Sequence, residues 1–111
     1  MAVAIENLDD VQVIVLAERI DSSNAVETEA AVRRALDAGP KILLDMEELV
    51  YVSSAGLRVV LLAAKQMRSV GGKIAVCGVA GNVRQVFEIS GFLSLFSVYP
   101  DRLAALTALR T

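Results

Sequence analysis

Short runs of aliphatic residues alternate with segments of helical periodicity along most of this chain. The runs KILLDM (41–46), KIAVCGV (73–79) and LFSVYP (95–100) have the length of buried strands. In the segments between them, apolar residues recur every three or four positions, as they do on one face of a helix. Strands that alternate with helices favour a parallel sheet with right-handed crossovers. The alternation therefore predicts an α/β layered fold.

The start of the chain differs from this alternation. Two Val- and Ile-rich runs, AVAIE (2–6) and VQVIVLA (11–17), are separated only by the turn 7–10, a pattern that predicts a β-hairpin. The hairpin supplies the antiparallel member of a mixed, mainly parallel sheet. The expected order is ββαβαβαβα, with four helices, and the helices are expected over about 24–38, 54–69, 81–91 and from 101 onward.

The predicted helices carry recognisable end signals. Asn24 with Glu27, and Asn82 with Gln85, resemble capping boxes, and Gly91 is expected to end the third helix. The helical positions expected to face the core are Ala25, Val32, Ala35, Leu36, Leu57, Leu61, Ala64, Met67, Val83, Val86, Phe87, Leu103, Leu106 and Leu109.

Composition indicates one globular domain over 1–111. Apolar residues make up 55% of the 111 residues and charged residues 22%, which is enough for a core of Val, Leu and Ala. The formal charge is −2 with both signs interspersed, so no basic stripe is available for direct nucleic-acid binding. The start of the chain lacks the basic and long apolar regions of a signal peptide, and we expect no membrane span.

The inventory of reactive residues excludes several chemistries. The chain has one cysteine and no histidine, so it cannot build a disulfide framework, a His/Cys zinc site or a Ser-His-Asp triad. Cys77 lies in an apolar run and is expected to be a buried thiol, which fits a reducing cytoplasm. GKIAVCGVAGN matches neither a dinucleotide-binding nor a Walker pattern. We therefore expect no cofactor and no metal.

The most informative stretch is VYVSSAGLRVVLLAAK (50–65), in which two serines and Ala-Gly interrupt apolar sequence at a predicted helix start. A serine there caps the helix by accepting a hydrogen bond from an unpaired N–H, a contribution of about 1 kcal/mol. Capping therefore explains only one of the two serines, Ser53 and Ser54. Gly56 in the first turn costs about 1 kcal/mol relative to alanine. It indicates close approach by a partner's backbone, with relief of crowding at the helix start as the alternative.

LLDMEELVYVSSAGLRVVL resembles the hallmark segment of the STAS-domain family of bacterial anti-sigma-factor antagonists. That segment is an apolar strand, an acidic turn and Asp-Ser-(Ser/Thr/Ala)-Gly-Leu at a helix start. AERIDSSNA and VRQVFEISGFLSLF are similar to other segments of the family, so the resemblance covers essentially the whole chain. Ser53 stands where the family has aspartate, Ala17 replaces a usual glycine, and Arg58 stands where a small residue is common.

The resemblance implies a regulator without enzymatic activity. In the family, an anti-sigma factor serine kinase phosphorylates the serine after the hallmark aspartate, which is Ser54 here, with Ser53 as the alternative acceptor. The unphosphorylated antagonist binds the kinase, and phosphorylation inactivates the antagonist. A metal-dependent serine phosphatase then restores the unphosphorylated form. The partner-binding residues expected from the resemblance are Asp21, Ser22, Asp45, Ser53, Ser54, Ala55, Gly56 and Arg58.

Other interpretations of these residues remain. Asp21 and Asp45 are equally typical of a helix cap and a turn, respectively. The whole chain also fits a STAS-type binding subunit of a lipid-transport or anion-transporter assembly, in which the serine is not phosphorylated. A small nucleotide-handling enzyme is disfavoured, because no cluster of acid, base and phosphate-binding groups is recognisable.

Overall fold

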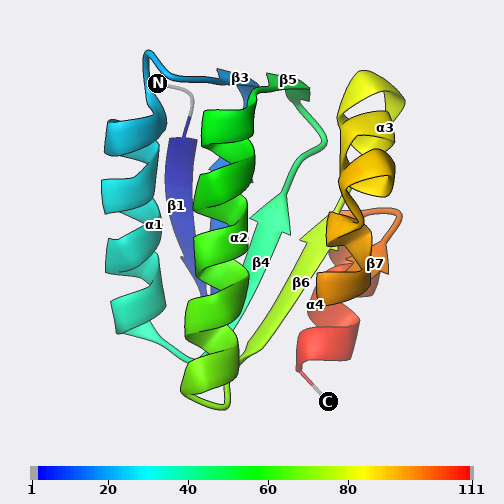
Figure 1. Ribbon diagram of the computed structural model, residues 1–111. Coiled ribbons are helices and arrows are strands. Elements are labelled where there is room, and N and C mark those ends of the chain that lie inside the picture. The colour runs from blue at the N-terminus through cyan, green and yellow to red at the C-terminus, as the bar shows by residue number, and fades with distance from the viewer. Residues whose placement is uncertain (1–2, 111) are drawn as a thin grey trace.

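The main sheet of the computed structural model, which describes residues 3–110, has the strand order β1-β2-β4-β6-β7 (Figure 1). β1 (Val3–Leu8) and β2 (Val11–Leu16) form the predicted antiparallel hairpin. β4 (Lys41–Asp45), β6 (Lys73–Cys77) and β7 (Ser97–Tyr99) continue the sheet in parallel pairs. The mixed, mainly parallel sheet is therefore confirmed. Ala2, which the hairpin prediction included, lies outside the described residues.

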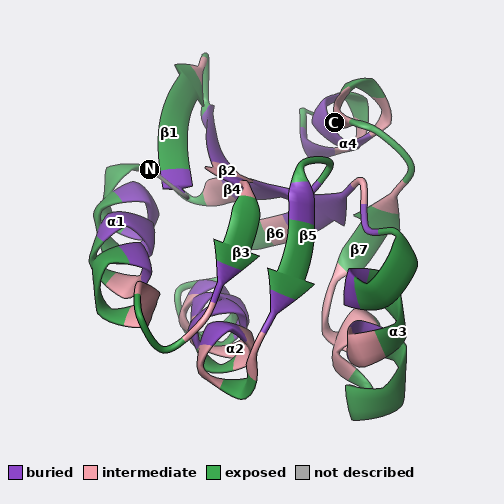
Figure 2. Cartoon of the chain, turned by 90° about the horizontal axis from the view of Figure 1, so that it is seen from above, coloured by how far each residue is buried: buried purple, intermediate pink, exposed green. Residues whose placement is uncertain are grey.

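Helices cover both faces of this sheet (Figure 2). α1 (Ala25–Ala38), α2 (Ser54–Ser69) and α3 (Gly81–Ser90) share one core with strand residues such as Ile42 and Leu44. α4 (Arg102–Leu109) packs on the opposite face, against residues that include Leu43. Since successive strand residues point to opposite faces and both faces are covered, the central strands read as continuous apolar runs.

A second, two-stranded parallel sheet was not predicted. It pairs β3 (Glu18–Ile20) with β5 (Leu49–Val52) and lies beside the start of α2 (Figure 1). The chain leaves the main sheet after Leu16 and enters the second sheet at Glu18, whose φ of 62° is unusual for a residue other than glycine. Strands of three and four residues are too short for a reliable alternation pattern, which is why the sequence did not reveal them.

Both expected capping boxes are wrong. α1 has no side-chain cap, and α3 begins at Gly81 after Ala80, so Asn82 is already inside the helix. The predicted end of α3 is confirmed, because Gly91 adopts a left-handed φ of 76°. The predicted strand 95–100 is shorter than expected: only Ser97–Tyr99 is extended, and a 3₁₀ helix, η1 (Phe92–Leu95), precedes it.

The expected helix faces are largely confirmed, and Leu103 is the one expected core position that is exposed. Leu103 is 76% exposed, because the short helix α4 buries a narrow stripe of Ala105, Leu106 and Leu109. Four other expected positions are half-buried: Ala25, Leu57, Leu61 and Val86. Of these, Ala25, Leu57 and Val86 pack against the core. The fully buried residues of α2 are Gly56, Val59, Val60, Ala63, Ala64 and Met67. Within residues 3–110, no helix is long and apolar enough to cross a bilayer.

Candidate functional site

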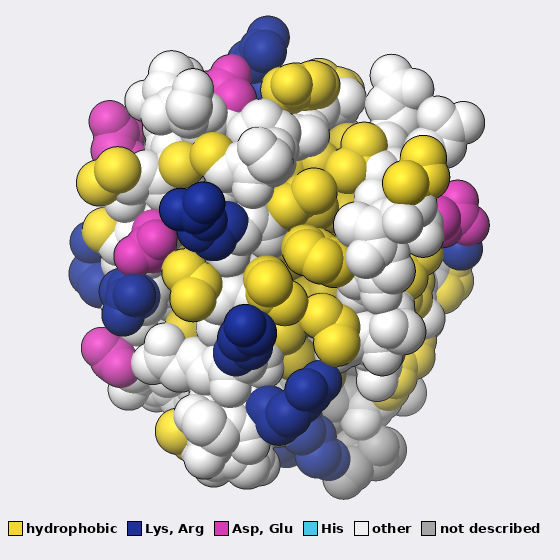
Figure 3. Space-filling model, viewed as in Figure 1, with side chains coloured by type: hydrophobic (Ala, Val, Ile, Leu, Met, Phe, Trp, Pro, Cys, Tyr) yellow, Lys and Arg dark blue, Asp and Glu magenta, His cyan; other side chains and the backbone are white. Residues whose placement is uncertain are grey.

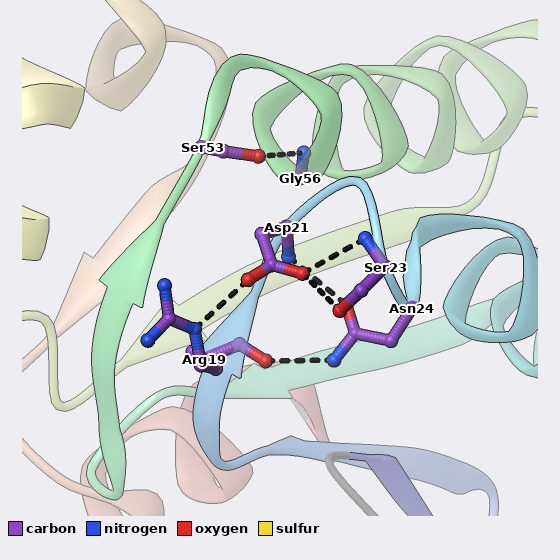
Figure 4. A network of polar contacts seen from close by, with 6 residues as sticks. All are labelled: Arg19, Asp21, Ser23, Asn24, Ser53 and Gly56. Atoms are coloured by element: carbon purple, nitrogen blue, oxygen red, sulfur yellow. Dashed lines mark hydrogen bonds and ion pairs between the residues drawn. The ribbon is translucent and has the colours of Figure 1, made fainter.

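The start of α2 is built on β5 and β3. Ser53, directly after β5, has an extended backbone, and its N–H donates to the Ile20 carbonyl at 2.9 Å. Its hydroxyl oxygen accepts from the Gly56 N–H at 3.4 Å, and its carbonyl accepts from the Leu57 N–H at 2.8 Å (Figure 4). Ser53 is therefore the N-cap of the helix and one of the two serines has a structural role.

Ser54 is placed differently from its neighbour. It is the first residue of α2, its side chain is exposed, and within residues 3–110 its hydroxyl makes no hydrogen bond. Ser22, in the turn before α1, and Arg58, one helical turn after Ser54, are also exposed, and Ala55 is half-exposed. These residues, with Asp21 and the two serines, are the expected partner-binding residues that are exposed or half-exposed at the start of α2 and in the turn before α1, and we name the six the docking face after that expectation. The docking face comprises Asp21, Ser22, Ser53, Ser54, Ala55 and Arg58.

Gly56 does not belong to the docking face, which corrects the expectation that a partner's backbone approaches it. The residue is buried, and a Cβ atom on it would lie 2.8 Å from the Ile20 carbonyl oxygen and 2.8 Å from Cγ2 of Val52. Contacts this short do not occur in relaxed structures. The close backbone approach that glycine permits is therefore made by β3 of the same chain.

Asp21 organises the turn between β3 and α1. One carboxylate oxygen accepts from the backbone N–H of Ser23 at 2.9 Å and from its hydroxyl, and the other accepts from Nε of Arg19 at 2.8 Å (Figure 4). Hydrogen bonds from Ser23, and then the bond from Arg19, hold the pKa of Asp21 below its ordinary value. The half-buried Asp21 therefore stays ionised, with its charge paired to Arg19.

Asn24 holds the same turn rather than capping α1. Its side-chain oxygen accepts from the Asp21 N–H at 2.9 Å, and its side-chain nitrogen donates to the Arg19 carbonyl at 2.9 Å (Figure 4). The amide therefore links β3 to the first turn of the helix. The sequence analysis placed Asn24 correctly at the start of α1, but its side chain bonds to Asp21 and Arg19 instead of capping the helix.

Asp45 lies in the interior, apart from the exposed docking face. It is 5% exposed, and Arg102 donates to one carboxylate oxygen at 2.9 and 3.0 Å. The other oxygen accepts from the Glu47 N–H at 3.1 Å, which is the turn role that the sequence left open. Arg102 also binds Glu6, so this network ties α4 to β4 and β1.

The same region contains the only three-residue set of metal-ligating type among the described residues: Asp45, Glu47 and Cys77, whose ligand atoms lie within 4.8 Å of one another. The Asp45 carboxylate is already bound by Arg102 and the Glu47 N–H. Burial, and then the charge of Asp45, raise the pKa of Cys77 to about 12, which opposes the thiolate that a metal requires. The donor set therefore fits a metal poorly.

Two features next to the docking face were missed in the sequence. The guanidinium of Arg19 lies 4.9 Å from the ring centroid of Tyr51, which is 46% exposed. Tyr51 and Val52 also line a mostly apolar groove of about 270 Å³ between β5 and α3, whose exposed rim includes Ile89. The aromatic and β-branched residues of VYV, directly before the serines, are the sequence signal from which this groove could have been inferred.

The fold combines a mixed, mainly parallel sheet with a small second sheet, whose strand β5 leads directly into the serine pair at the start of α2. The family model for the STAS domain matches residues 2–105, so the chain belongs to the STAS-domain family. The family resemblance of the hallmark segment is thereby confirmed.

Relatives within the family carry the name of anti-sigma factor antagonist. One is BtrV of Bordetella bronchiseptica, which is 44% identical over 112 residues that span 100% of this chain and 97% of BtrV. The crystal structure of an anti-sigma factor antagonist from Thermotoga maritima superimposes with a TM-score of 0.91 at 22% identity and covers 98% of this chain and 95% of that one. Unphosphorylated SpoIIAA, another anti-sigma factor antagonist, superimposes with a TM-score of 0.79 at 20% identity and 98% coverage of both chains.

Proposed function

We propose that this protein is an anti-sigma factor antagonist that works by exchanging partners under the control of one phosphate. The unphosphorylated chain binds an anti-sigma factor serine kinase through the docking face, and it acts by binding rather than by catalysis. The kinase phosphorylates Ser54, which releases the complex, and a metal-dependent serine phosphatase restores the unphosphorylated form. The exchange belongs in the cytoplasm, where reducing conditions suit the lone buried Cys77.

The observation that carries this proposal is the different placement of the two serines. The hydroxyl of Ser53 accepts the cap hydrogen bond from Gly56, whereas the hydroxyl of Ser54 is exposed and makes no bond to residues 3–110. A kinase must reach the acceptor oxygen and remove its proton, which favours Ser54 over the capping serine. SpoIIAA, which shares the fold, has been solved in both an unphosphorylated and a phosphorylated form.

The position of Ser54 explains how a phosphate would act without unfolding the domain. A phosphate adds about −1.5 to −2 charges, and the N-terminal end of a helix stabilises anions through its free N–H groups and its dipole. Arg58 lies four residues after Ser54, on the same side of α2, and forms no ion pair with the described residues. Both features favour a folded phosphorylated state.

Binding would respond more strongly than folding. A kinase surface that covers the neutral hydroxyl would have to desolvate the phosphate, and an unpaired buried charge costs several kcal/mol. The apolar groove beside Tyr51 gives the partner a contact that does not depend on the phosphate.

The test uses the full chain with its cognate kinase and ATP. We expect one phosphate per chain, located on Ser54 by mass spectrometry, with loss of modification in Ser54→Ala and retention in Ser53→Ala. Ser54→Asp should fold as the wild type does and lose kinase binding, whereas the neutral control Ser54→Asn should keep most of the binding.

Two results would contradict the proposal. A phosphate found on Ser53 would show that the capping serine, and not Ser54, is the acceptor. Kinase binding by Ser54→Asp that equals that of Ser54→Asn would rule out a charge switch and would favour the alternative of a binding subunit in a lipid-transport or anion-transporter assembly.

A further inference from the structure

A second cavity lies at the end of α2 opposite to Ser54. It has a volume of about 570 Å³ and is bounded by the last turns of α2 and α4, the start of β6, and the segment from η1 into β7. Ser54 and Arg68 are fourteen residues apart on one helix, which corresponds to about 21 Å along its axis. This cavity, the edge cleft, is therefore separate from the docking face.

The edge cleft exists because β7 is shorter than β6. The pairing between these strands begins at Ala75 with Ser97, so Lys73 and Ile74 have no strand neighbour on that side. The chain before β7 forms η1 instead of extending the strand. The edge of the sheet is thus left open between the α2 face and the α4 face.

The edge cleft carries positive charge without a counter-ion. Arg68 and Lys73 both line it, and neither forms an ion pair with any residue of 3–110, although the chain as a whole is acidic. No described acidic residue lines the cleft, and Ser94, Ser97 and Tyr99 add hydroxyl groups to its wall. Two cations and several hydroxyls suit one anionic head group.

The remainder of the wall is apolar. Ile74, Leu95, Phe96 and Leu109 line the cleft together with alanines. Figure 3 shows hydrophobic side chains gathered between α2 and the neighbouring helical segments, with Lys and Arg side chains at the lower end of that hollow. A cavity with a volume in the range of small-molecule sites, lined by both polar and apolar residues, suits a ligand that has both characters.

We propose that the edge cleft binds an anionic amphiphile, a small carboxylate with an aliphatic tail. Arg68 and Lys73 receive the carboxylate, and the tail lies along Phe96, Leu95 and Leu109. This site is independent of the phosphate switch, since none of its lining residues belongs to the docking face.

The test is titration of the purified full chain with decanoate below its micellar concentration, followed by calorimetry and by amide chemical shifts. We expect saturable 1:1 binding, with shifts at Gly72, Ser94 and Ala108. Acetate, which has the head alone, and decanol, which has the tail alone, should each bind at least tenfold more weakly. The double variant Arg68→Gln with Lys73→Gln should weaken decanoate binding at least tenfold.

A matched double variant separates a site from general charge. Arg34 and Lys65 also lack ion pairs with the described residues, lie on α1 and α2, and do not line the edge cleft. Arg34→Gln with Lys65→Gln should leave decanoate binding unchanged. Equal weakening by both double variants, non-saturable binding, or shifts confined to other residues would overturn the proposal. So would an absence of decanoate binding by the wild type; a lower melting temperature of the cleft variant would then show that Arg68 and Lys73 only stabilise the end of α2 and the start of β6.

Discussion

Replacing Gly56 by alanine tests the buried packing contact between α2 and the two strands β3 and β5. Alanine in place of glycine inside a helix is favourable by about 1 kcal/mol when the added methyl meets nothing. Here the methyl would lie 2.8 Å from the Ile20 carbonyl oxygen, 2.8 Å from Cγ2 of Val52 and 2.9 Å from Cγ2 of Ile20. Two of these three neighbours are buried side-chain atoms and one is backbone, so they cannot rotate freely out of the way.

The free-energy cost of overpacking should therefore exceed the gain from the higher helix propensity of alanine. Inserting a methyl into a packed core costs about 1–3 kcal/mol. The carbonyl that must shift also accepts the 2.9 Å hydrogen bond from the Ser53 N–H, so the N-cap is disturbed as well. We expect Gly56→Ala to lower the free energy of unfolding by about 1–2 kcal/mol, which corresponds to roughly 4–16 °C in melting temperature for a domain of this size.

Chemical denaturation of wild type and variant, with the slope compared as well as the midpoint, measures this loss. Gly39→Ala is the matched control, because a Cβ atom there would have one neighbour, Cγ of Gln12, at an ordinary 3.9 Å, and the backbone is extended. That variant should be neutral or slightly more stable. A Gly56→Ala protein as stable as the wild type would show that β3 does not pack against α2 as described.

Three further predictions concern buried and bridging groups. Arg102→Gln should lower the free energy of unfolding in urea by about 3 kcal/mol, because it leaves the buried Asp45 carboxylate without its cationic partner. Arg110→Gln, which breaks an exposed ion pair with Asp9, should lower it by less than about 1 kcal/mol. Asn24→Ala should lower the free energy of unfolding by about 1–2 kcal/mol, because it removes the side-chain hydrogen bonds to the Asp21 N–H and the Arg19 carbonyl. If this variant loses more kinase binding than a variant of equal stability, the turn positions Asp21 for binding. The folded-state pKa of Cys77, about 12, lies above its unfolded value near 9, so unfolding releases a proton between these values and stability should fall as pH rises from 9 to 12. Cys77→Ala should lack that part of the pH dependence, and the folded wild-type thiol should resist alkylation at pH 8.

Much of the architecture follows from local patterns in the sequence. The short apolar runs and the helical periods between them specify the alternating order of elements, because burial of one face imposes the period of each element. Single residues also act locally: Ser53 caps α2, Asp101 caps α4 by accepting from the Ala104 N–H at 2.9 Å, and Gly91 ends α3. The assignment of Ser54 needed the family resemblance in addition, and it stays a prediction.

The tertiary structure decided which distant residues share a site. β3 and β5 are paired although α1 and β4 separate them in the sequence, and only this pairing places the Ile20 carbonyl against Gly56. Arg102 reaches Asp45 across 57 positions of the chain. Local periodicity tells that a residue is buried or that a helix begins, but it carries no information about which neighbour lies opposite. That choice depends on how complete elements pack. The sequence by itself therefore determined the strands of the main sheet, the four helices and the serine pair at a helix start. Packing decided the pairing of β3 with β5, the role of Gly56, the burial of Asp45 and the existence of the edge cleft.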